Sequence, residues 1–298
     1  MKAGLVTFVG RPNAGKSTLI NRFVGQKIAI VSDKPQTTRH RILGVRHTAA
    51  GEMVFIDTPG IHKPMHRMNR RMVDTATSTL READLVVLVV DASIAAGGGD
   101  RFVAEMIKTS GVATIAALNK IDLIRKPALL PIMQRYGGLE LFKAIVPISA
   151  ETGEGVDALE QEILAGLPEG EPIYGSDFFT DQTQRTLTAE LIREKVLRHT
   201  RDELPYATAV VIEQFEEPTT PGGLTRIFAS IIVDTESQKP IVVGKGGDMI
   251  KRIGTEARVD LEAMLEGRVF LDLHVKVRED WRDSERILNE IGMGRSRE

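Results

Sequence analysis

Short apolar runs rich in β-branched residues recur along the first half of the chain. They cover residues 5–9, 53–56, 85–90, 112–118 and 145–148, and turn-forming or polar residues follow each of them. A short run of this kind is typical of a parallel strand that is buried on both faces. The segment after the glycine-rich turn that ends the first run has the composition of the first turns of a helix. The pattern therefore predicts buried parallel strands, the first of which is joined to a helix.

The second half of the chain shows a different order of elements. Apolar residues at helical spacing predict a helix at residues 186–201, and two apolar runs at residues 208–215 and 226–233 predict strands on either side of a turn-rich stretch. Two helices separated by a Gly-x-x-Gly loop follow at residues 241–254, and a last strand is expected at residues 269–277. The predicted order is α-β-β-α-α-β.

The segment between the two halves is rich in proline, glycine and acidic side chains, which is typical of a linker. We therefore expect a first domain at residues 1–167, a linker at 168–184, a second domain at 185–285 and a C-terminal tail at 286–298.

Composition limits the chemistry that the 298 residues can perform. There is no cysteine, which excludes disulfides, thiolate metal sites and cysteine nucleophiles. Residues 1–184 carry 21 Lys and Arg against 20 Asp and Glu, and residues 185–298 carry 18 against 21. Neither half is basic, so a nucleic-acid site would have to be a local patch. The longest apolar runs are too short to span a bilayer, so we expect no transmembrane segment.

The sequence between the first strand and its helix fits the phosphate-binding pattern G-x-x-x-x-G-K-[ST]. A strand, a glycine-rich turn and a helix N-terminus direct backbone N–H groups and the positive end of the helix dipole toward one point, which suits a triphosphate. Lys16 would reach the β- and γ-phosphates, and Ser17 would hold Mg²⁺. The residues assigned to this loop are Gly10, Arg11, Pro12, Asn13, Ala14, Gly15, Lys16, Ser17 and Thr18.

A second motif, Asp57-Thr58-Pro59-Gly60, follows the second buried strand. A carboxylate at the end of a parallel strand beside a phosphate loop can hold Mg²⁺, usually through water. The backbone N–H of Gly60 would be free to meet a γ-phosphate. The tetrapeptide is also a good turn, so it becomes informative only together with the phosphate loop.

The loop after the strand at residues 112–118 decides which base is bound. An aspartate carboxylate accepts hydrogen bonds from N1–H and N2–H₂ of guanine, and adenine lacks both donors in that arrangement. Asp122 would therefore select guanine, while Asn119 and Lys120 would tie this loop to the phosphate loop and stack on the base. In the loop Ser149-Ala150-Glu151, the N–H of Ala150 would approach the O6 of guanine.

Two segments are candidates for nucleotide-dependent switches. The first lies between residues 26 and 44, where the hydroxyl of Thr38, in preference to that of Thr37, would join the Mg²⁺ shell only in the triphosphate state. The second, at residues 62–74, carries several basic side chains that could contact RNA or a partner, although such a run is more often a solvated helix face. The metal ligands expected from the sequence are Ser17, Thr38 and Asp57.

The Gly-x-x-Gly loop of the second half is the candidate nucleic-acid site. Its glycines would let a nucleic-acid strand approach the backbone, and the N-terminus of the following helix favours phosphate. Aromatic residues are few, so base recognition should rest on backbone hydrogen bonds and apolar contacts, and Trp281 is expected in the core. The expected RNA contacts are Ile241, Val243, Gly244, Lys245, Gly246, Gly247, Ile250, Lys251 and Arg252.

In this linear order, the nucleotide motifs resemble those of the translation-factor-related GTPases over roughly residues 3–167. The resemblance implies an α/β P-loop GTPase domain, with a mostly parallel sheet, helices on both faces and the ligand at the carboxyl ends of the strands. It implies GTP and Mg²⁺ as cofactors and hydrolysis of GTP to GDP and phosphate as the activity. The residues that would carry catalysis are Asn13, Lys16, Thr38 and Gly60.

The position after Gly60 departs from the Ras-like pattern. Ras-like proteins place there a glutamine that orients the attacking water, whereas this chain has Ile61, which cannot orient water. Hydrolysis would therefore be slow or organised differently. In related GTPases with an asparagine at the position of Asn13, that side chain often coordinates K⁺, which would supply the positive charge that an arginine finger supplies elsewhere. The resemblance thus adds K⁺ as a candidate cofactor.

The second half, with its Gly-x-x-Gly loop in the order α-β-β-α-α-β, resembles an α+β KH domain of the bacterial type. In KH domains this loop clamps about four nucleotides of single-stranded nucleic acid. The two halves together resemble the bacterial ribosome-assembly GTPases that carry a C-terminal KH domain, and residues 35–42 and 281–284 fit that family closely. The resemblance implies binding of the single-stranded 3′ end of small-subunit ribosomal RNA, favoured by GTP, during assembly of the small ribosomal subunit.

Two other classes of protein fit parts of the pattern. One is a signalling or membrane-associated GTPase whose second domain binds protein. The other is a GTP-dependent enzyme that modifies RNA, against which the lack of a cysteine nucleophile counts. We expect a cytoplasmic monomer, with peripheral contact at the inner face of the cell membrane as the alternative location. The run Gly97-Gly98-Gly99, expected in a flexible loop, has no interpretation from the sequence.

Overall fold

The computed structural model describes residues 1–34, 36–59, 66–220 and 222–293. The chain divides into two compact units, which we call the first and second domains. The first holds residues up to 181 and the second those from 182 on, except that residues 32–34 and 66–68 group with the second. Among the described helices, none combines the length and the hydropathy that crossing a membrane requires.

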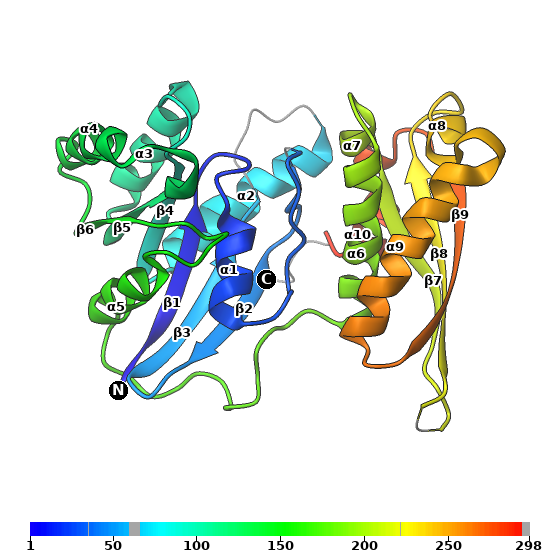
Figure 1. The fold of residues 1–298 in the computed structure, drawn as a ribbon, viewed down its shortest axis with the longest axis horizontal. Helices are drawn as coiled ribbons and strands as arrows, with labels where there is room; N and C mark the ends of the chain where they lie inside the picture. The colour runs from blue at the N-terminus through cyan, green and yellow to red at the C-terminus, as the bar shows by residue number, and fades with distance from the viewer. Residues whose placement is uncertain (35, 60–65, 221, 294–298) are drawn as a thin grey trace. The chain divides into compact units, whose positions relative to one another are not determined.

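The first domain is built on a six-stranded sheet in the order β2-β3-β1-β4-β5-β6 (Figure 1). All neighbouring strands are parallel except β2 and β3, which are antiparallel. The predicted parallel-rich sheet is therefore confirmed, and β2 is a strand that the apolar pattern did not predict. The strands are β1 (Lys2–Val9), β2 (Ile42–His47), β3 (Gly51–Asp57), β4 (Leu85–Asp91), β5 (Thr114–Asn119) and β6 (Ala144–Pro147).

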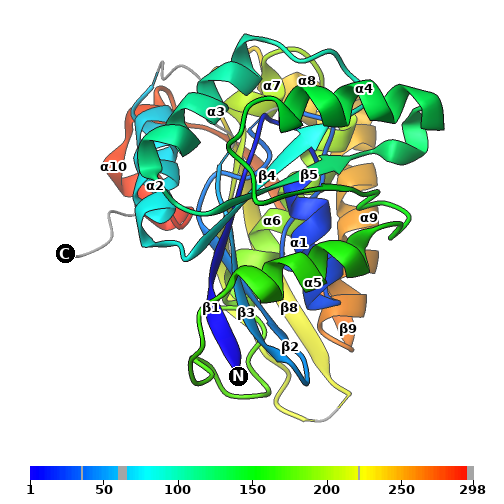
Figure 2. The same ribbon diagram turned by 90° about the vertical axis from the view of Figure 1, so that its left-hand side faces the viewer.

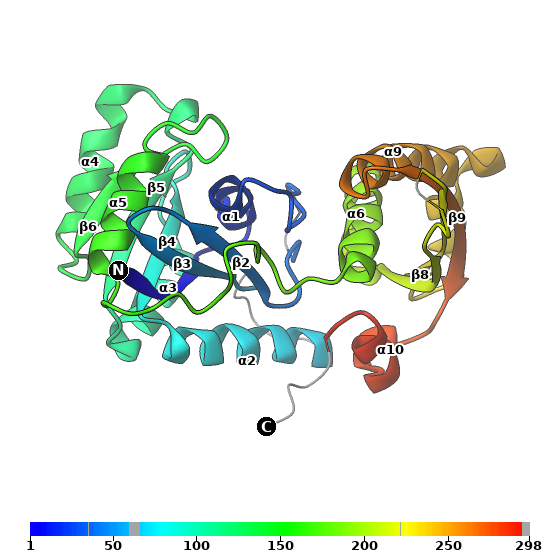
Figure 3. The same cartoon turned by 90° about the horizontal axis from the view of Figure 1, so that it is seen from below.

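Helices cover both faces of this sheet, as Figures 2 and 3 show. One face packs on α1 and α5 and the other on α2, α3 and α4. The rings of Phe8, Phe23 and Phe55 stack between α1 and the sheet, with centroids 4.7 Å apart for Phe23 and Phe55 and 5.3 Å for Phe8 and Phe55. This stack holds the last turn of α1 against β1 and β3. The helices are α1 (Lys16–Val24), α2 (Arg67–Glu82), α3 (Gly98–Ser110), α4 (Lys126–Gly137) and α5 (Val156–Gly166).

Residues 173–180, which fall within the predicted linker, lie along the free edge of β2. The backbone N–H of Val45 donates to the carbonyl of Phe179 at 2.9 Å, and the hydroxyl of Thr180 donates to the carbonyl of Leu43 at 2.7 Å. An isolated antiparallel bridge adds to these bonds. The segment therefore satisfies backbone groups that an edge strand would otherwise leave open.

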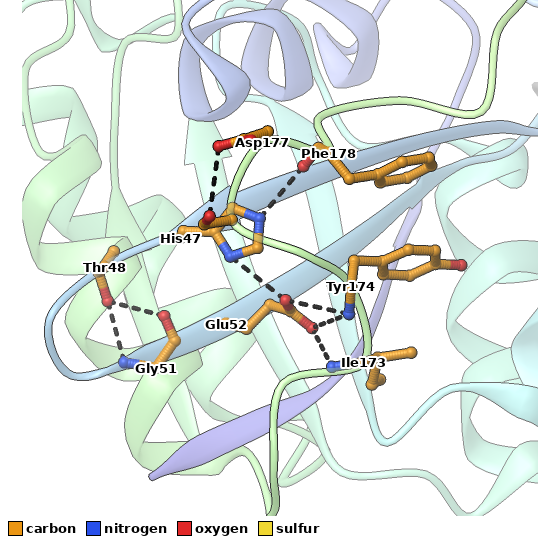
Figure 4. Close-up of polar contacts among 9 residues, drawn as sticks. His47, Thr48, Gly51, Glu52, Ile173, Tyr174, Asp177 and Phe178 are labelled. Atoms are coloured by element: carbon orange, nitrogen blue, oxygen red, sulfur yellow. Dashed lines mark hydrogen bonds and ion pairs between the residues drawn. The ribbon is translucent and has the colours of Figure 1, made fainter.

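A buried carboxylate holds the same segment against β3 (Figure 4). The side chain of Glu52 is 1% exposed and accepts hydrogen bonds from the backbone N–H groups of Ile173 at 2.7 Å and Tyr174 at 3.3 Å. His47 lies between this carboxylate, 3.2 Å from its Nδ1, and the carbonyl of Phe178, 3.1 Å from its Nε2. The Tyr174 and Phe178 rings stack at 4.5 Å and cover apolar residues of the sheet. Residues 173–180 are thus part of the first domain's packing.

The run Gly97-Gly98-Gly99 is not a flexible loop, which corrects the expectation from the sequence. Gly97 is the N-cap of α3, and the other two glycines form its first turn. The Asp100 carboxylate accepts from the N–H of Gly97 at 2.7 Å and from the Arg11 guanidinium at 3.1 Å. A Cβ atom at Gly99 would lie 3.3 Å from the Arg11 side chain. The glycines therefore let an arginine of the phosphate loop lie against the start of α3.

The second domain is a three-stranded sheet in the order β7-β8-β9, with β7 antiparallel and β9 parallel to β8. Helices α6 and α9 pack on one face of it. This arrangement confirms the predicted α-β-β-α-α-β order. Trp281 is fully buried, as expected, and its Nε1 donates to the carbonyl of Ala207 at 2.9 Å. The elements are α6 (Gln184–His199), α7 (Leu204–Ala207), β7 (Ala209–Glu216), β8 (Leu224–Val233), α8 (Lys239–Val243), α9 (Asp248–Met264), β9 (Arg268–Val277) and α10 (Glu285–Glu290).

Glu52→Gln should loosen residues 173–180, because the neutral amide offers one acceptor oxygen to the backbone N–H groups of Ile173 and Tyr174 where the charged carboxylate offers two. A buried donor left without an acceptor costs about 1–3 kcal/mol. We therefore expect amide hydrogen exchange across this segment to accelerate by roughly tenfold or more. Glu171→Gln removes the same charge from an exposed position two residues before this segment and serves as the control. Equal exchange in the two variants would contradict the role given to Glu52.

Candidate nucleotide site and candidate nucleic-acid groove

The predicted nucleotide residues lie in loops that follow β1, β3, β5 and β6. The carboxyl ends of these parallel strands meet at one edge of the sheet, which brings the loops together. Gly60, whose N–H was predicted to meet the γ-phosphate, and Ile61 lie outside the residues that the structure describes.

The three predicted metal ligands converge on one carboxylate oxygen. The hydroxyl of Ser17 donates to Oδ2 of Asp57 at 2.7 Å, and the hydroxyl of Thr38 donates to the same oxygen at 3.1 Å. The two hydroxyl oxygens lie 2.9 Å apart. These residues come from α1, from the segment before β2 and from the end of β3, so the tertiary structure assembles the cluster from three separate parts of the chain.

A cation fits this cluster. Asp57 is fully buried, and among the described residues its Oδ1 has no hydrogen-bond partner. Burial raises the pKa of Asp57, while Lys16 and the hydroxyls of Ser17 and Thr38 act in the opposite sense. Mg²⁺ prefers a few oxygen ligands of this kind, completed by phosphate and water. No group of three or more His, Asp and Glu side chains suited to a metal occurs in the described part of the chain.

Lys16 is held inside the phosphate loop. Its Nζ donates to the carbonyl of Gly10 at 3.3 Å and to that of Arg11 at 3.1 Å. Burial lowers the pKa of Lys16, and the carboxylate of Asp57 partly opposes this. A phosphate group bound in the loop would offer the buried ammonium a strong anionic partner.

Asn119 ties the phosphate loop to the base loops. Its Nδ2 donates to the carbonyl of Ala14 at 2.8 Å, and its Oδ1 accepts from the N–H of Ala150 at 2.8 Å. Gly15 has a positive φ of 98°, and a Cβ atom there would lie 2.1 Å from the Asn119 amide nitrogen. Only glycine fits that position, because both the backbone conformation and the close approach of the amide exclude a side chain.

Lys120 forms an ion pair that the sequence analysis missed. Its Nζ lies 2.6 Å from Oδ2 of Asp91, the last residue of β4, and Oδ1 of Asp91 accepts from the N–H of Ser93 at 2.9 Å. Burial acts to raise the pKa of Asp91, but the hydrogen bonds from Lys120 and Ser93 outweigh it and lower this pKa. The sequence did hold a signal, since Asp91 follows a buried strand just as Asp57 does. Asp122 is exposed in a single 3₁₀ turn directly after Lys120.

Arg22 also holds the base loop, and nothing in the sequence pointed to it. It projects from α1 and donates to the carbonyl of Ala150 at 2.6 Å and to that of Glu151 at 2.5 Å.

Ser149 is buried, and its hydroxyl accepts from the N–H of Thr152 at 3.1 Å. The hydroxyl of Thr58 donates to the carbonyl of Phe8 at 2.9 Å. The other predicted residues of the phosphate and Mg²⁺ loops, Pro12, Asn13, Thr18 and Pro59, lie in the described loops or at the start of α1.

A groove of about 430 Å³ runs between α9 and β9 in the second domain. Two of the predicted RNA contacts, Ile250 and Lys251, line it. Lys245 and Gly246 are exposed in the Gly-x-x-Gly loop before α9, and Ile241 is 55% exposed in α8. Val243, Gly244 and Gly247 are partly buried in the same stretch, and Arg252 is exposed.

The far wall of the groove escaped the sequence analysis. The lining that it missed is Leu224 from β8, Gly254, Thr255 and Arg258 from α9, and Val269, Phe270, Leu271 and Leu273 from β9. The wall is mostly apolar, while Lys245, Lys251, Arg252 and Arg258 are exposed at the loop and along α9. An apolar wall beside a row of cations suits bases on one side and phosphates on the other.

Two family descriptions match the chain. The family described as 50S ribosome-binding GTPase matches residues 5–120, and the family described as KH domain matches residues 203–282. A crystal structure of Aquifex aeolicus Era bound to GDP and AlF4⁻ superposes with a TM-score of 0.93 at 39% identity and covers 99% of this chain and 100% of that one. Era in complex with MgGDPNP and nucleotides 1506–1542 of 16S ribosomal RNA gives a TM-score of 0.94 at 40% identity, with 99% of both chains covered.

Two relatives are similar over almost their whole length. The GTPase Era of Syntrophus aciditrophicus is 48% identical over 98% of this chain and 95% of its own. The GTPase Era of Geobacter metallireducens is 47% identical over 98% of this chain and 97% of its own. Identity at this level over both domains shows that the chain belongs to the GTPase Era family.

Proposed function

We propose that this protein hydrolyses GTP with Mg²⁺ and binds the single-stranded 3′ end of small-subunit ribosomal RNA, and that it assists assembly of the small ribosomal subunit. One observation carries the proposal: a single chain holds both a phosphate site tied to a base site by Asn119 and a Gly-x-x-Gly loop followed by a helix, α9, that lines a groove. The relatives support it, since solved Era structures contain GDP and AlF4⁻ or MgGDPNP with 16S ribosomal RNA. We propose a monomer located in the cytoplasm, with the inner face of the membrane as the alternative location. A chain without cysteine suits a reducing compartment.

The buried residues of the phosphate site act by position and charge. Lys16 and the N–H groups at the start of α1 would hold the β- and γ-phosphates, and Ser17, Thr38 and Asp57 would hold Mg²⁺, which neutralises phosphate charge when bound. Thr38 belongs to the segment that precedes β2, so its attachment to the metal would order that segment in the GTP state and release it after hydrolysis.

RNA affinity tests both halves of the proposal. We expect a single-stranded oligonucleotide from the 3′ end of small-subunit ribosomal RNA to bind more tightly with a non-hydrolysable GTP analogue than with GDP. Gly246→Asp should weaken binding by at least about tenfold, because it adds negative charge where phosphates approach. Gly111→Asp is the matched control, since both glycines have a positive φ, 62° and 68°, and a Cβ atom at either meets no other atom within 4 Å.

Two outcomes would contradict the RNA half. If Gly246→Asp and Gly111→Asp bind RNA equally well, the Gly-x-x-Gly loop does not carry the interaction. If binding is equally weak in both nucleotide states, the second domain serves another partner, as in a signalling or membrane-associated GTPase.

Base selection by Asp122 can be tested by changing the base. Asp122→Asn should lower GTP affinity by roughly two orders of magnitude or more, because the amide cannot accept from both N1–H and N2–H₂ of guanine. The variant should gain affinity for xanthosine triphosphate, whose C2 carbonyl can accept from the new N–H₂ group. Competition with a fluorescent GDP analogue measures both affinities. Asp157→Asn, at an exposed position of α5, should leave them unchanged.

We propose K⁺ as the source of the positive charge that an arginine finger supplies in other GTPases. GTP turnover should be roughly tenfold or more faster in K⁺ than in Na⁺ at equal ionic strength. Asn13→Gly should be slow in both salts. Glycine is the appropriate replacement because Asn13 has a positive φ of 63°. Equal turnover of the wild-type protein in the two salts would remove K⁺ from the mechanism.

A further inference from the structure

The first domain holds a pocket of about 590 Å³ between α4 and the segment that joins β4 to α3. Helices α3 and α4 cover the same face of the sheet (Figure 2), and none of the described residues predicted to touch GTP lines the pocket. Small-molecule sites usually measure about 300–1,000 Å³ and are mostly apolar with a few polar groups. The pocket fits that description. Its apolar lining includes Val90, Ile94, Ile124, Ala128 and Ile132.

The pocket contains a buried hydroxyl that lacks a hydrogen-bond partner. Tyr136 of α4 lines the pocket and is 5% exposed, and among the described residues its hydroxyl makes no hydrogen bond. Burial raises the pKa of Tyr136 to about 12, so the group keeps its proton at neutral pH and can donate. A buried polar group without a partner costs free energy, which an acceptor on a ligand would recover. The pocket therefore favours a ligand that carries an acceptor.

The charges of the pocket leave one cation without an acidic partner. Two carboxylates line it, but each is paired: Asp91 lies 2.6 Å from Lys120. Asp100 lies 3.1 Å from Arg11. Arg135 also lines the pocket and is exposed, and no described acidic side chain forms an ion pair with it. Helix α4 itself contains no Asp or Glu. One guanidinium and one hydroxyl suit a singly charged carboxylate, which an arginine can hold through two parallel hydrogen bonds.

We propose that this pocket binds a small amphipathic carboxylate. The apolar body of the ligand lies against the side chains from β4 and α4, and its carboxylate accepts hydrogen bonds from Arg135 and from the hydroxyl of Tyr136. A docked protein would cover an apolar patch that extends beyond the pocket. The exposed apolar side chains next along the chain, Leu123 and Leu130, do not line the pocket, which favours a small molecule.

The bound carboxylate also stabilises bound nucleotide. Asp91 and Asp100 line the pocket, while their ion-pair partners belong to the nucleotide site: Arg11 is part of the phosphate loop, and Lys120 was predicted to stack on the base. A ligand that excludes water from the pocket strengthens both ion pairs, because charges interact more strongly where the dielectric constant is low. Arg11 and Lys120 are then held in place, and guanine nucleotide leaves more slowly. This coupling rests on the GTP binding proposed above, whereas the carboxylate site does not.

Isoleucine methyl groups in the pocket report binding directly. We would titrate the full chain with octanoate and follow the methyl NMR signals of Ile94 and Ile132, and repeat the titration with octanol and octylamine. These probes share an apolar chain and differ in the head group. We expect octanoate to bind with a Kd of about a millimolar or tighter, and roughly tenfold more tightly than octanol. Octylamine should bind more weakly still, because Arg135 repels its charge.

Substitutions in the pocket should change octanoate binding by different amounts. Tyr136→Phe removes only the hydroxyl and should weaken octanoate roughly tenfold, and octanol less, since hydrogen bonds to a charged group are stronger. Arg135→Gln should weaken octanoate roughly two- to fivefold, as expected for an exposed ion pair, and Arg81→Gln at an exposed position of α2 is its control. Ala128→Phe fills the pocket and should abolish binding, while Ala165→Phe makes the same change at an exposed position of α5.

Nucleotide affinity tests the coupling. Saturating octanoate should raise the affinity for a fluorescent GDP analogue by roughly fivefold or more, through slower release, and the analogue should raise the affinity for octanoate by the same factor. Ala128→Phe should lose this effect and Ala165→Phe should keep it. A thermal unfolding curve shows that both variants are folded, and Tyr136→Phe tests the same pocket if Ala128→Phe is not.

Several results would contradict the inference. If Ile94 and Ile132 show no saturable shift up to about 10 mM octanoate, or if octanol binds as tightly, the pocket is not a carboxylate site. Shifts confined to Ile250, which lines the second-domain groove, would place octanoate elsewhere and have the same meaning. Binding with no change in affinity for the GDP analogue would remove the coupling. The NMR titration needs no nucleotide, so failure of the protein to bind GTP would remove the proposed function and the coupling but leave the carboxylate site standing.

Discussion

The side-chain amide of Asn119 is the contact on which the rest of the nucleotide site depends. A parallel sheet brings the ends of β1, β5 and β6 to one edge, but the loops that follow could still move apart. Asn119 uses its donor on the loop after β1 and its acceptor on the loop after β6. Arg22 of α1 adds a second hydrogen bond to the loop after β6. The distance between the phosphate end and the base end of the site is therefore fixed by buried hydrogen bonds rather than by the strands alone.

The cluster at Asp57 adds an electrostatic demand to this geometry. Among the described residues, Oδ1 of the buried Asp57 has no hydrogen-bond partner. Burial of such a carboxylate charge costs free energy, and the raised pKa of Asp57 reflects that cost. The two hydroxyls that lie against the other oxygen cannot neutralise its charge. A divalent cation can neutralise that charge. One of the two hydroxyls belongs to Thr38, which lies before β2 in a segment that has no secondary structure of its own, so the cation would also hold that segment.

Strand β2 receives contacts from two parts of the chain that the sequence separates widely. The segment that contains Thr38 leads directly into β2, and residues 173–180 lie along its free edge. Glu52 fixes that second segment by accepting backbone hydrogen bonds inside the protein. A movement of the segment before β2 would thus act on a strand whose free edge residues 173–180 hold in place. In the second domain, the edge strand β9 forms one wall of the groove.

The sequence by itself determined every strand except β2, the start of α1 and the motifs, because apolar periodicity, glycine turns and carboxylates at strand ends are local properties. It placed Lys16, Asp57, Asn119 and the Gly-x-x-Gly loop correctly in the order of elements. Only the tertiary structure decided that Arg22 and Asp91 join the site and that β9 forms the far wall of the groove. Each of these contacts joins residues from 29 to 128 positions apart or on strands paired through a crossover, and no local pattern encodes such a pairing. The packing of residues 173–180 was hidden for the same reason, since proline and glycine predict a break in regular structure but not what the broken segment lies against.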